Sequence, residues 1–133
     1  MSQENVNFIR RIYEALDHGD VPAVLATFDP NIEWIAADNS PYAEGSPFHG
    51  PNEVLEGSLM RIGADWEGFT VKANEFLDAG DTVIMLGIYS GVRKATGKTI
   101  HAQAAHIWTI DGGKVVKWQQ YTDTYQLAES ANM

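Results

Sequence analysis

Residues 99–124, TIHAQAAHIWTIDGGKVVKWQQYTDT, decide the fold, because they carry the pattern of two long strands joined by a tight turn. The turn is Asp111-Gly112-Gly113, and glycine adopts the positive φ of a hairpin turn without steric cost. With a three-residue loop, His106 pairs with Trp118. Side chains alternate between the faces of a strand. One face is then apolar with two polar groups set into it: Ala102, Ala104, His106, Trp108, Val116, Trp118 and Gln120. Such a face lines either a packed core or a cavity.

Length and composition predict a single domain, residues 1–133, because a chain of 133 residues buries about two thirds of its unfolded surface. The absence of cysteine excludes disulfides and thiolate metal sites. A net charge of −9 repels phosphate backbones and anionic lipids, so neither nucleic acid nor a membrane is expected as a partner. The first residues lack the apolar run of a signal peptide, and no run approaches the ~20 apolar residues of a membrane span. A cytoplasmic protein is the expectation.

The rest of the chain divides into helices followed by strands. Apolar residues at helical spacing predict helices over residues 3–18, 21–28 and 50–62, the first and last ended by Gly19 and Gly63. Strands are predicted at 32–36, 69–77 and 82–93, with a loop at 37–51 and a frayed turn after Tyr125. Helices first and strands later are typical of an α+β fold in which helices pack on one face of a curved antiparallel sheet.

Four motifs carry a family resemblance: the Gly19-Asp20 helix break, the strand Ile32-Glu33-Trp34, the helix start Phe48-His49-Gly50-Pro51 and the turn 111–116, DGGKVV. With them the chain resembles the SnoaL-like and ketosteroid-isomerase-related proteins of the nuclear-transport-factor-2-like superfamily. The resemblance implies a cone-shaped curved antiparallel sheet wrapped by three N-terminal helices, a cystatin-like α+β barrel. It also implies one apolar cavity inside the cone and a homodimer formed through the sheet.

The resemblance places the family's catalytic positions on other residue types. The ketosteroid isomerase tyrosine falls near Ile12, the general-base aspartate near Trp34 and the second acid at His106, so steroid isomerisation by that route is not expected. Polyketide cyclases keep an acid/base aspartate where this chain has Gln120, which hydrogen-bonds but does not titrate. Asp123 follows on the opposite strand parity and serves as an acid only if the strand end turns it inward.

His106 is the main catalytic candidate, because a histidine among apolar residues is a neutral imidazole able to accept a proton near pH 7. The alternative is a core histidine bonded to the backbone. Gln120 is expected to hold a substrate oxygen or a water, and Asp123 to tune or replace His106, with helix or turn capping as its alternative. Tyr42 is a candidate lid residue. The candidate substrate-binding residues are rings and hydroxyls expected to face the cone: Tyr13, Trp34, His49, Tyr89, Trp108 and Trp118.

The expected function is cofactor-free general acid/base chemistry on a small, mostly apolar organic substrate, of isomerase, cyclase, dehydratase or hydrolase type. Ketosteroid-isomerase-like and polyketide-cyclase-like enzymes are the nearest models. Neither a cofactor nor a metal site is expected, since the histidines lack metal-ligand spacing. The first alternative is a non-catalytic ligand-binding or carrier protein with the same cavity. The second is an interaction module that dimerises through the sheet and keeps a filled core.

Overall fold

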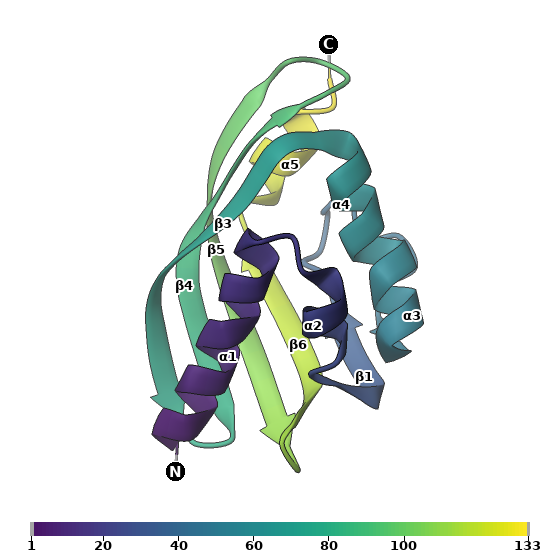
Figure 1. The fold of residues 1–133 in the computed structure, drawn as a ribbon. Coiled ribbons are helices and arrows are strands. Elements are labelled where there is room, and N and C mark those ends of the chain that lie inside the picture. Colours follow the sequence, from purple (N-terminus) through teal and green to yellow (C-terminus); the bar gives the residue numbers. More distant parts are fainter. Residues whose placement is uncertain (1, 133) are drawn as a thin grey trace.

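The computed structural model describes residues 2–132, which form a six-stranded curved sheet with helices on its inner side (Figure 1). The strand order is β2-β1-β6-β5-β4-β3. The strands are β1 Phe28–Ile35, β2 Phe48–His49, β3 Trp66–Ala79, β4 Thr82–Arg93, β5 Thr99–Asp111 and β6 Lys114–Thr122. The α+β class is confirmed.

One strand pair departs from the predicted antiparallel sheet. β1 runs parallel to β6, whereas the other neighbouring pairs are antiparallel. Parallel neighbours need a long connection. The helices and four strands between β1 and β6 supply it, and the result places Trp34 of β1 directly beside Trp118 of β6.

The β5–β6 hairpin forms as predicted, but with a tighter turn. Asp111 pairs with Lys114, and Gly112 and Gly113 take φ values of 58° and 76° in the two-residue loop. Glycine is required there because both φ angles are positive.

A register shift between Thr109 and Ile110 corrects the predicted pairing, so that His106 lies opposite Gln120 instead of Trp118. The two-residue loop and this irregularity each move the pairing by one residue, and the total offset of two preserves the alternation of faces. His106 and Gln120 therefore share the inner face, as predicted. The placement of Val116 on that face is wrong, because past the irregularity its neighbour Val115 is the fully buried residue.

Two helices begin the chain. α1, Ser2–Asp17, confirms the first predicted helix and buries Ile9 and Ile12 against the inner face of the sheet. α2, Val21–Leu25, is shorter than predicted because Phe28 already belongs to β1. Asp20 caps α2 by accepting a hydrogen bond from the backbone N–H of Ala23 at 3.2 Å.

The third helical segment is continuous but irregular. It runs as α3, Gly50–Val54, then a π-helical turn η1, Leu55–Leu59, then α4, Met60–Asp65. The N–H of Met60 reaches back five residues to the carbonyl of Leu55. A last helix, α5, Thr124–Glu129, replaces the predicted frayed turn and lies over one end of the sheet (Figure 1).

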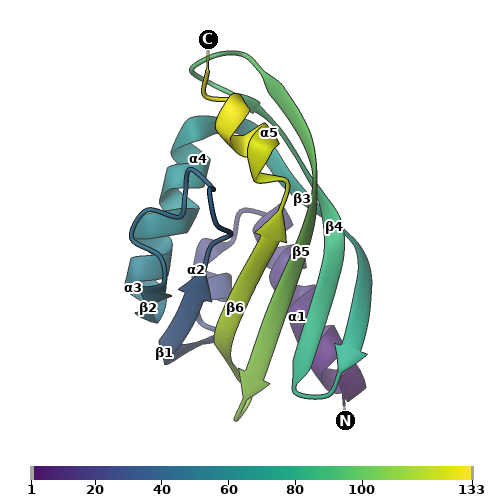
Figure 2. The same ribbon diagram turned by 180° about the vertical axis from the view of Figure 1, so that it is seen from behind.

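The two faces of the sheet differ in what covers them. The inner face packs against α1 around fully buried side chains that include Trp108, Met85 and Val83. Figure 2 shows the outer face of β3–β6 toward the viewer, with α1 behind the sheet. Leu77 and Tyr121 are exposed, and Leu86 and Ile107 are half-buried. Among residues 2–132, no helix is long and apolar enough to cross a membrane.

Candidate ligand-binding site

A pocket of about 280 Å³ lies between the inner face of the sheet and the surrounding helices. Its wall is mostly apolar, with aromatic rings from β1, β3, β4, β5 and β6. Of the described residues that line it, Asp17 is the one carboxylate, exposed at the end of α1, and none is lysine or arginine. The polar side chains in the wall are Tyr13, Asp17, Tyr42, Ser58, Thr70, Tyr89, His106 and Gln120.

A buried chain of hydrogen bonds runs across the deep wall of this pocket. The indole N–H of Trp108 donates to the Tyr13 hydroxyl at 2.8 Å, and that hydroxyl lies 2.6 Å from Nδ1 of His106. Nε2 of His106 is hydrogen-bonded in turn to the Tyr89 hydroxyl. The strand periodicity of β4 and β5 turns Tyr89 and His106 inward, and α1 brings Tyr13 across to them.

Gln120 completes the chain at its far end. Its Nε2 donates to the Tyr89 hydroxyl at 2.8 Å, and its Oε1 accepts from the backbone N–H of Ala37 at 3.0 Å. The Ala37 N–H can only donate, which fixes the amide so that its NH₂ group faces Tyr89. Gln120 therefore holds Tyr89 in place rather than projecting freely into the pocket.

Burial keeps the central groups of this chain neutral. Desolvation lowers the pKa of His106 from 6.5 to about 3. Desolvation also raises the pKa of Tyr13 well above 10, although the Trp108 hydrogen bond opposes the rise. The pKa of Tyr89 is raised for the same reason, against the opposing Gln120 hydrogen bond. At neutral pH this chain of hydrogen bonds thus contains one uncharged imidazole and two uncharged phenols.

One hydroxyl proton in this chain of hydrogen bonds has no acceptor. A neutral imidazole has one N–H and one lone pair, so one tyrosine donates to His106 and the other accepts from it. Each tyrosine oxygen already accepts a hydrogen bond, from Trp108 or from Gln120. The tyrosine that accepts from His106 therefore keeps an O–H proton that no acceptor within residues 2–132 takes up. This proton lies on a residue that lines the pocket.

Two stacked indoles form the neighbouring wall. Trp34 and Trp118 lie 3.8 Å apart between ring centroids at an interplanar angle of 17°. Their Nε1 atoms are buried and have no hydrogen-bond partner in the described chain. A buried donor without an acceptor costs about 1–3 kcal/mol. The wall therefore offers a flat apolar surface with unused donors close to it.

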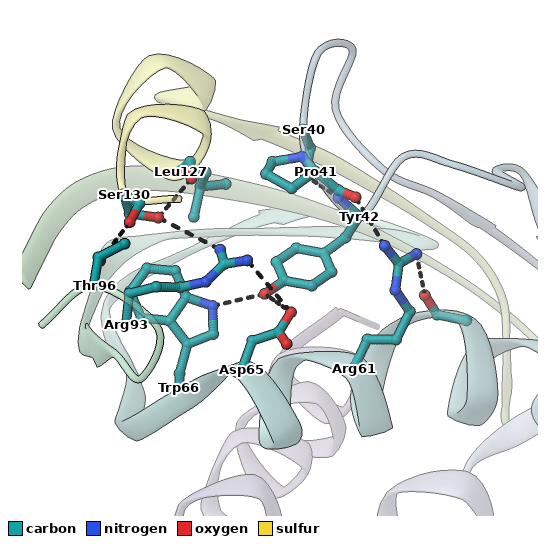
Figure 3. Close-up of polar contacts among 11 residues, drawn as sticks. Ser40, Pro41, Tyr42, Arg61, Asp65, Trp66, Arg93, Thr96, Leu127 and Ser130 are labelled. Carbon is teal, nitrogen blue, oxygen red and sulfur yellow. Dashed lines mark hydrogen bonds and ion pairs between the residues drawn. The ribbon is translucent and has the colours of Figure 1, made fainter. Parts of the chain in front are cut away.

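A polar cluster lies beside α5 and the loop of residues 37–47 (Figure 3). The Tyr42 hydroxyl donates to Asp65 at 2.8 Å and accepts from the Trp66 indole N–H at 2.8 Å. Arg93 lies 3.6 Å from Asp65. Burial and the hydrogen bond to Asp65 raise the pKa of Tyr42 to about 12. Tyr42, a lining residue, is thus hydrogen-bonded to the end of α4 and to the start of β3.

The structure brings most of the predicted site residues together and leaves two outside. Tyr13, Trp34, Tyr89, His106, Trp108, Trp118 and Gln120 all line the pocket. His49 is exposed at the N-terminus of α3, away from the lining. Asp123 is exposed and caps α5 by accepting from the backbone N–H and the side-chain amide of Gln126. Capping was its alternative assignment, and β6 ends before the chain could turn it inward.

Three polar lining residues are absent from the predicted site: Asp17, Ser58 and Thr70. Asp17 and Thr70 are exposed, whereas Ser58 is buried on the apolar stripe of the third helix. Ser58 lies four residues after Val54 and four before Ile62, so the helical period itself places it on that stripe. A serine in the middle of an apolar stripe was the available signal. Within residues 2–132, no three His, Cys, Asp or Glu side chains are grouped to hold a metal ion.

The chain is similar to a known domain family and to several solved structures. The family model of the SnoaL-like domain matches residues 9–118. No curated protein matches the chain. A crystal structure of an NTF2-like protein from Burkholderia thailandensis is 35% identical with a TM-score of 0.91, and the match covers 96% of this chain and 97% of that one.

Two further crystal structures share the fold. An NTF2-like protein from Burkholderia xenovorans is 27% identical with a TM-score of 0.86, over 99% of this chain and 98% of that chain. A protein with a ketosteroid-isomerase-like fold from Catenulispora acidiphila is 17% identical with a TM-score of 0.78, over 95% and 92% of the two chains. The family model spans most of the sequence and the fold agrees with it, so the chain belongs to the SnoaL-like domain family, with the nuclear-transport-factor-2-like fold.

Proposed function

We propose that this protein binds a small, mostly apolar organic molecule in the pocket and catalyses cofactor-free acid/base chemistry at an oxygen-bearing group of that molecule. Reactions of isomerase, cyclase, dehydratase or hydrolase type fit this description. The observation that carries the proposal is the tyrosine proton left over in the Tyr13–His106–Tyr89 chain. A ligand carbonyl or hydroxyl oxygen is the acceptor that this proton lacks.

The pKa shifts indicate how the site acts. Because burial favours the neutral forms of Tyr13, Tyr89 and His106, the site donates a hydrogen bond and resists full proton transfer. A fixed donor in an apolar site stabilises negative charge as it develops on a carbonyl oxygen during enolisation, while a solvent water molecule takes up the α-proton. The absence of cationic lining residues among those described favours an uncharged ligand.

The predicted shuttle role of His106 is revised in this proposal. Both of its ring nitrogens are hydrogen-bonded to tyrosines, and its pKa is about 3, so it is a poor base toward a ligand. His106 instead sets which tyrosine keeps its proton. It is a positioning residue, and the tyrosine hydroxyl is the group that contacts the ligand.

The proposal is tested by following deuterium incorporation at the α-carbon of 2-tetralone, an apolar bicyclic ketone, by NMR in D₂O. We expect the protein to accelerate exchange and the double variant Tyr13→Phe/Tyr89→Phe to lose about 100-fold of that acceleration, the loss typical of a removed oxyanion donor. Tyr121→Phe removes a hydroxyl from the exposed outer face and is the matched control. Exchange that is unchanged in the double variant contradicts the proposal.

A non-catalytic carrier is the second candidate, and one observation favours it. The one lining carboxylate, Asp17, is exposed at the end of α1, so no strong base faces the deep wall among the described lining residues. Binding of 2-tetralone without any acceleration of exchange identifies a carrier.

The homodimer through the sheet stays a prediction, which light scattering after size-exclusion chromatography will test.

A further inference from the structure

Ser58 occupies an unusual place in the wall opposite the sheet. It lies in the π-helical turn η1, where the Met60 N–H bonds to the Leu55 carbonyl instead of the carbonyl four residues back. π-helical turns are rare in proteins, and those that occur often lie at functional sites. Ser58 is 6% exposed and lines the pocket beside Leu59 and Ile62, so it is a polar residue on an otherwise apolar helix face.

The Ser58 hydroxyl has no hydrogen-bond partner among residues 2–132. A serine inside a helix ordinarily bonds to the carbonyl of the preceding turn. This hydroxyl is not sealed in the interior: unlike Nε1 of Trp34 and Trp118, it is accessible from the pocket. The partner of this hydroxyl is therefore expected to come from outside the chain, through the pocket that Ser58 lines.

Neighbouring contacts hold the π-helical turn in position. A Cβ added to Gly57 would lie 2.3 Å from Cε1 of Phe48, so glycine permits close packing of the turn on β2. Arg61 donates to the Gly57 carbonyl at 3.3 Å and to the Pro41 carbonyl at 3.0 Å (Figure 3). The turn is thereby fastened to the loop that carries Tyr42, and Ser58 is presented from a fixed backbone.

We propose that Ser58 is a second polar anchor for the ligand and determines its specificity. This inference rests on the proposed function. The tyrosine hydroxyl binds one oxygen on the sheet side, and Ser58 binds a second polar group on the helix side. The preferred ligand is therefore an uncharged, flat, largely apolar molecule with oxygen-bearing groups at both ends. A hydroxyl both donates and accepts, so Ser58 suits a hydroxyl or a carbonyl at that second end.

A ligand anchor and a structural serine differ in their effect on stability. Ser58→Ala removes a hydroxyl that has no partner within residues 2–132 and introduces the residue with the highest helix propensity. We therefore expect an unchanged or raised Tm, as for functional residues that are kept at a cost in stability. A structural hydrogen bond would instead make Ser58→Ala destabilising.

Calorimetric titration with matched ligand pairs tests the anchor. The pairs are 2-naphthol with naphthalene-2,6-diol, and 4-phenylphenol with biphenyl-4,4′-diol. In the wild type, at least one diol should bind about fivefold or more tightly than its mono-ol, which exceeds the twofold statistical advantage of a symmetric ligand by about one hydrogen bond. In Ser58→Ala the ratio should fall to about twofold or less, while the mono-ol affinity stays the same.

The controls separate the two proposals. Thr99→Val removes an exposed hydroxyl of β5 outside the pocket and should keep the wild-type ratio. A ratio that persists in Ser58→Ala, or a wild type in which neither diol exceeds the statistical advantage, overturns the Ser58 anchor and leaves the proposed function standing. Failure of all four compounds to bind the wild type overturns the proposed function, and the anchor with it.

Discussion

Acidification should destabilise the protein through His106. In the folded state the pKa of His106 is about 3, and the ordinary value of 6.5 applies when the chain unfolds. Between these two values the unfolded chain binds a proton that the folded protein excludes. Stability is therefore fully present above pH 6.5 and is lost as the pH falls toward 3.

The size of the loss follows from the pKa difference. Each pH unit within the window costs about 1.4 kcal/mol, so lowering the pH from 7 to 4 removes on the order of 3 kcal/mol through this one residue. A domain of this kind has a total stability of only about 5–15 kcal/mol. The effect is thus large enough to measure by equilibrium unfolding.

Urea unfolding followed by tryptophan fluorescence at pH 7, 6, 5 and 4 provides the assay. His106→Gln should flatten the pH dependence, whatever its stability at pH 7, because the titrating group is gone. His101→Gln removes an exposed histidine from the outer face of the same strand and is the control. If wild type and His106→Gln lose stability in parallel between pH 6.5 and 4, then His106 is not held neutral by burial, and the proton count fails.

Three further outcomes are expected. Tyr13→Phe and Tyr89→Phe should each retain part of the affinity for 2-naphthol, because the remaining tyrosine can supply the donor. The double variant should lose about fivefold or more of that affinity by calorimetry. Equal affinity in the wild type and all three variants would contradict this expectation. Gly57→Ala should destabilise by about 1–3 kcal/mol through its clash with Phe48, measured by urea unfolding, and an unchanged midpoint would refute the packing argument. Asp123→Ala should cost about 1 kcal/mol through the lost cap of α5 and leave 2-tetralone exchange unchanged; a loss of exchange would restore Asp123 to the site.

Alternation along β5 and β6 was enough to place His106, Trp118 and Gln120 on one face, because a strand has a period of two. The register could not be obtained in the same way. The irregularity at Thr109 and Ile110 has no sequence signature, and it decides that Gln120 faces His106. Periodicity therefore predicted which residues share the pocket wall but not which of them are neighbours.

Tyr13 shows a second limit of the sequence. The resemblance placed the family's tyrosine position near Ile12, which is instead a core residue with 1% exposure. Tyr13 reaches His106 because a tyrosine side chain is long and α1 crosses the inner face close to β5. Chain position alone could not show this, since it depends on how the helix is seated on the sheet.

The π-helical turn and the positions of Asp123 and His49 also depend on the folded structure. Nothing in residues 50–62 distinguishes a π-helical turn from a regular helix, so the setting of Ser58 emerges only from packing against Phe48. Asp123 became a cap because β6 ends at Thr122 and α5 needs an N-cap acceptor. His49 lies outside the pocket because it is the N-cap residue of α3.

A crystal structure of the protein with 2-naphthol tests the central claim most directly. The account predicts that the ring lies in the pocket against Trp34 and Trp118. Its oxygen should lie about 2.7–2.8 Å from the hydroxyl oxygen of Tyr13 or Tyr89. A ligand bound elsewhere, or one in the pocket whose oxygen contacts neither tyrosine, would contradict the assignment of the spare proton and with it the proposed function.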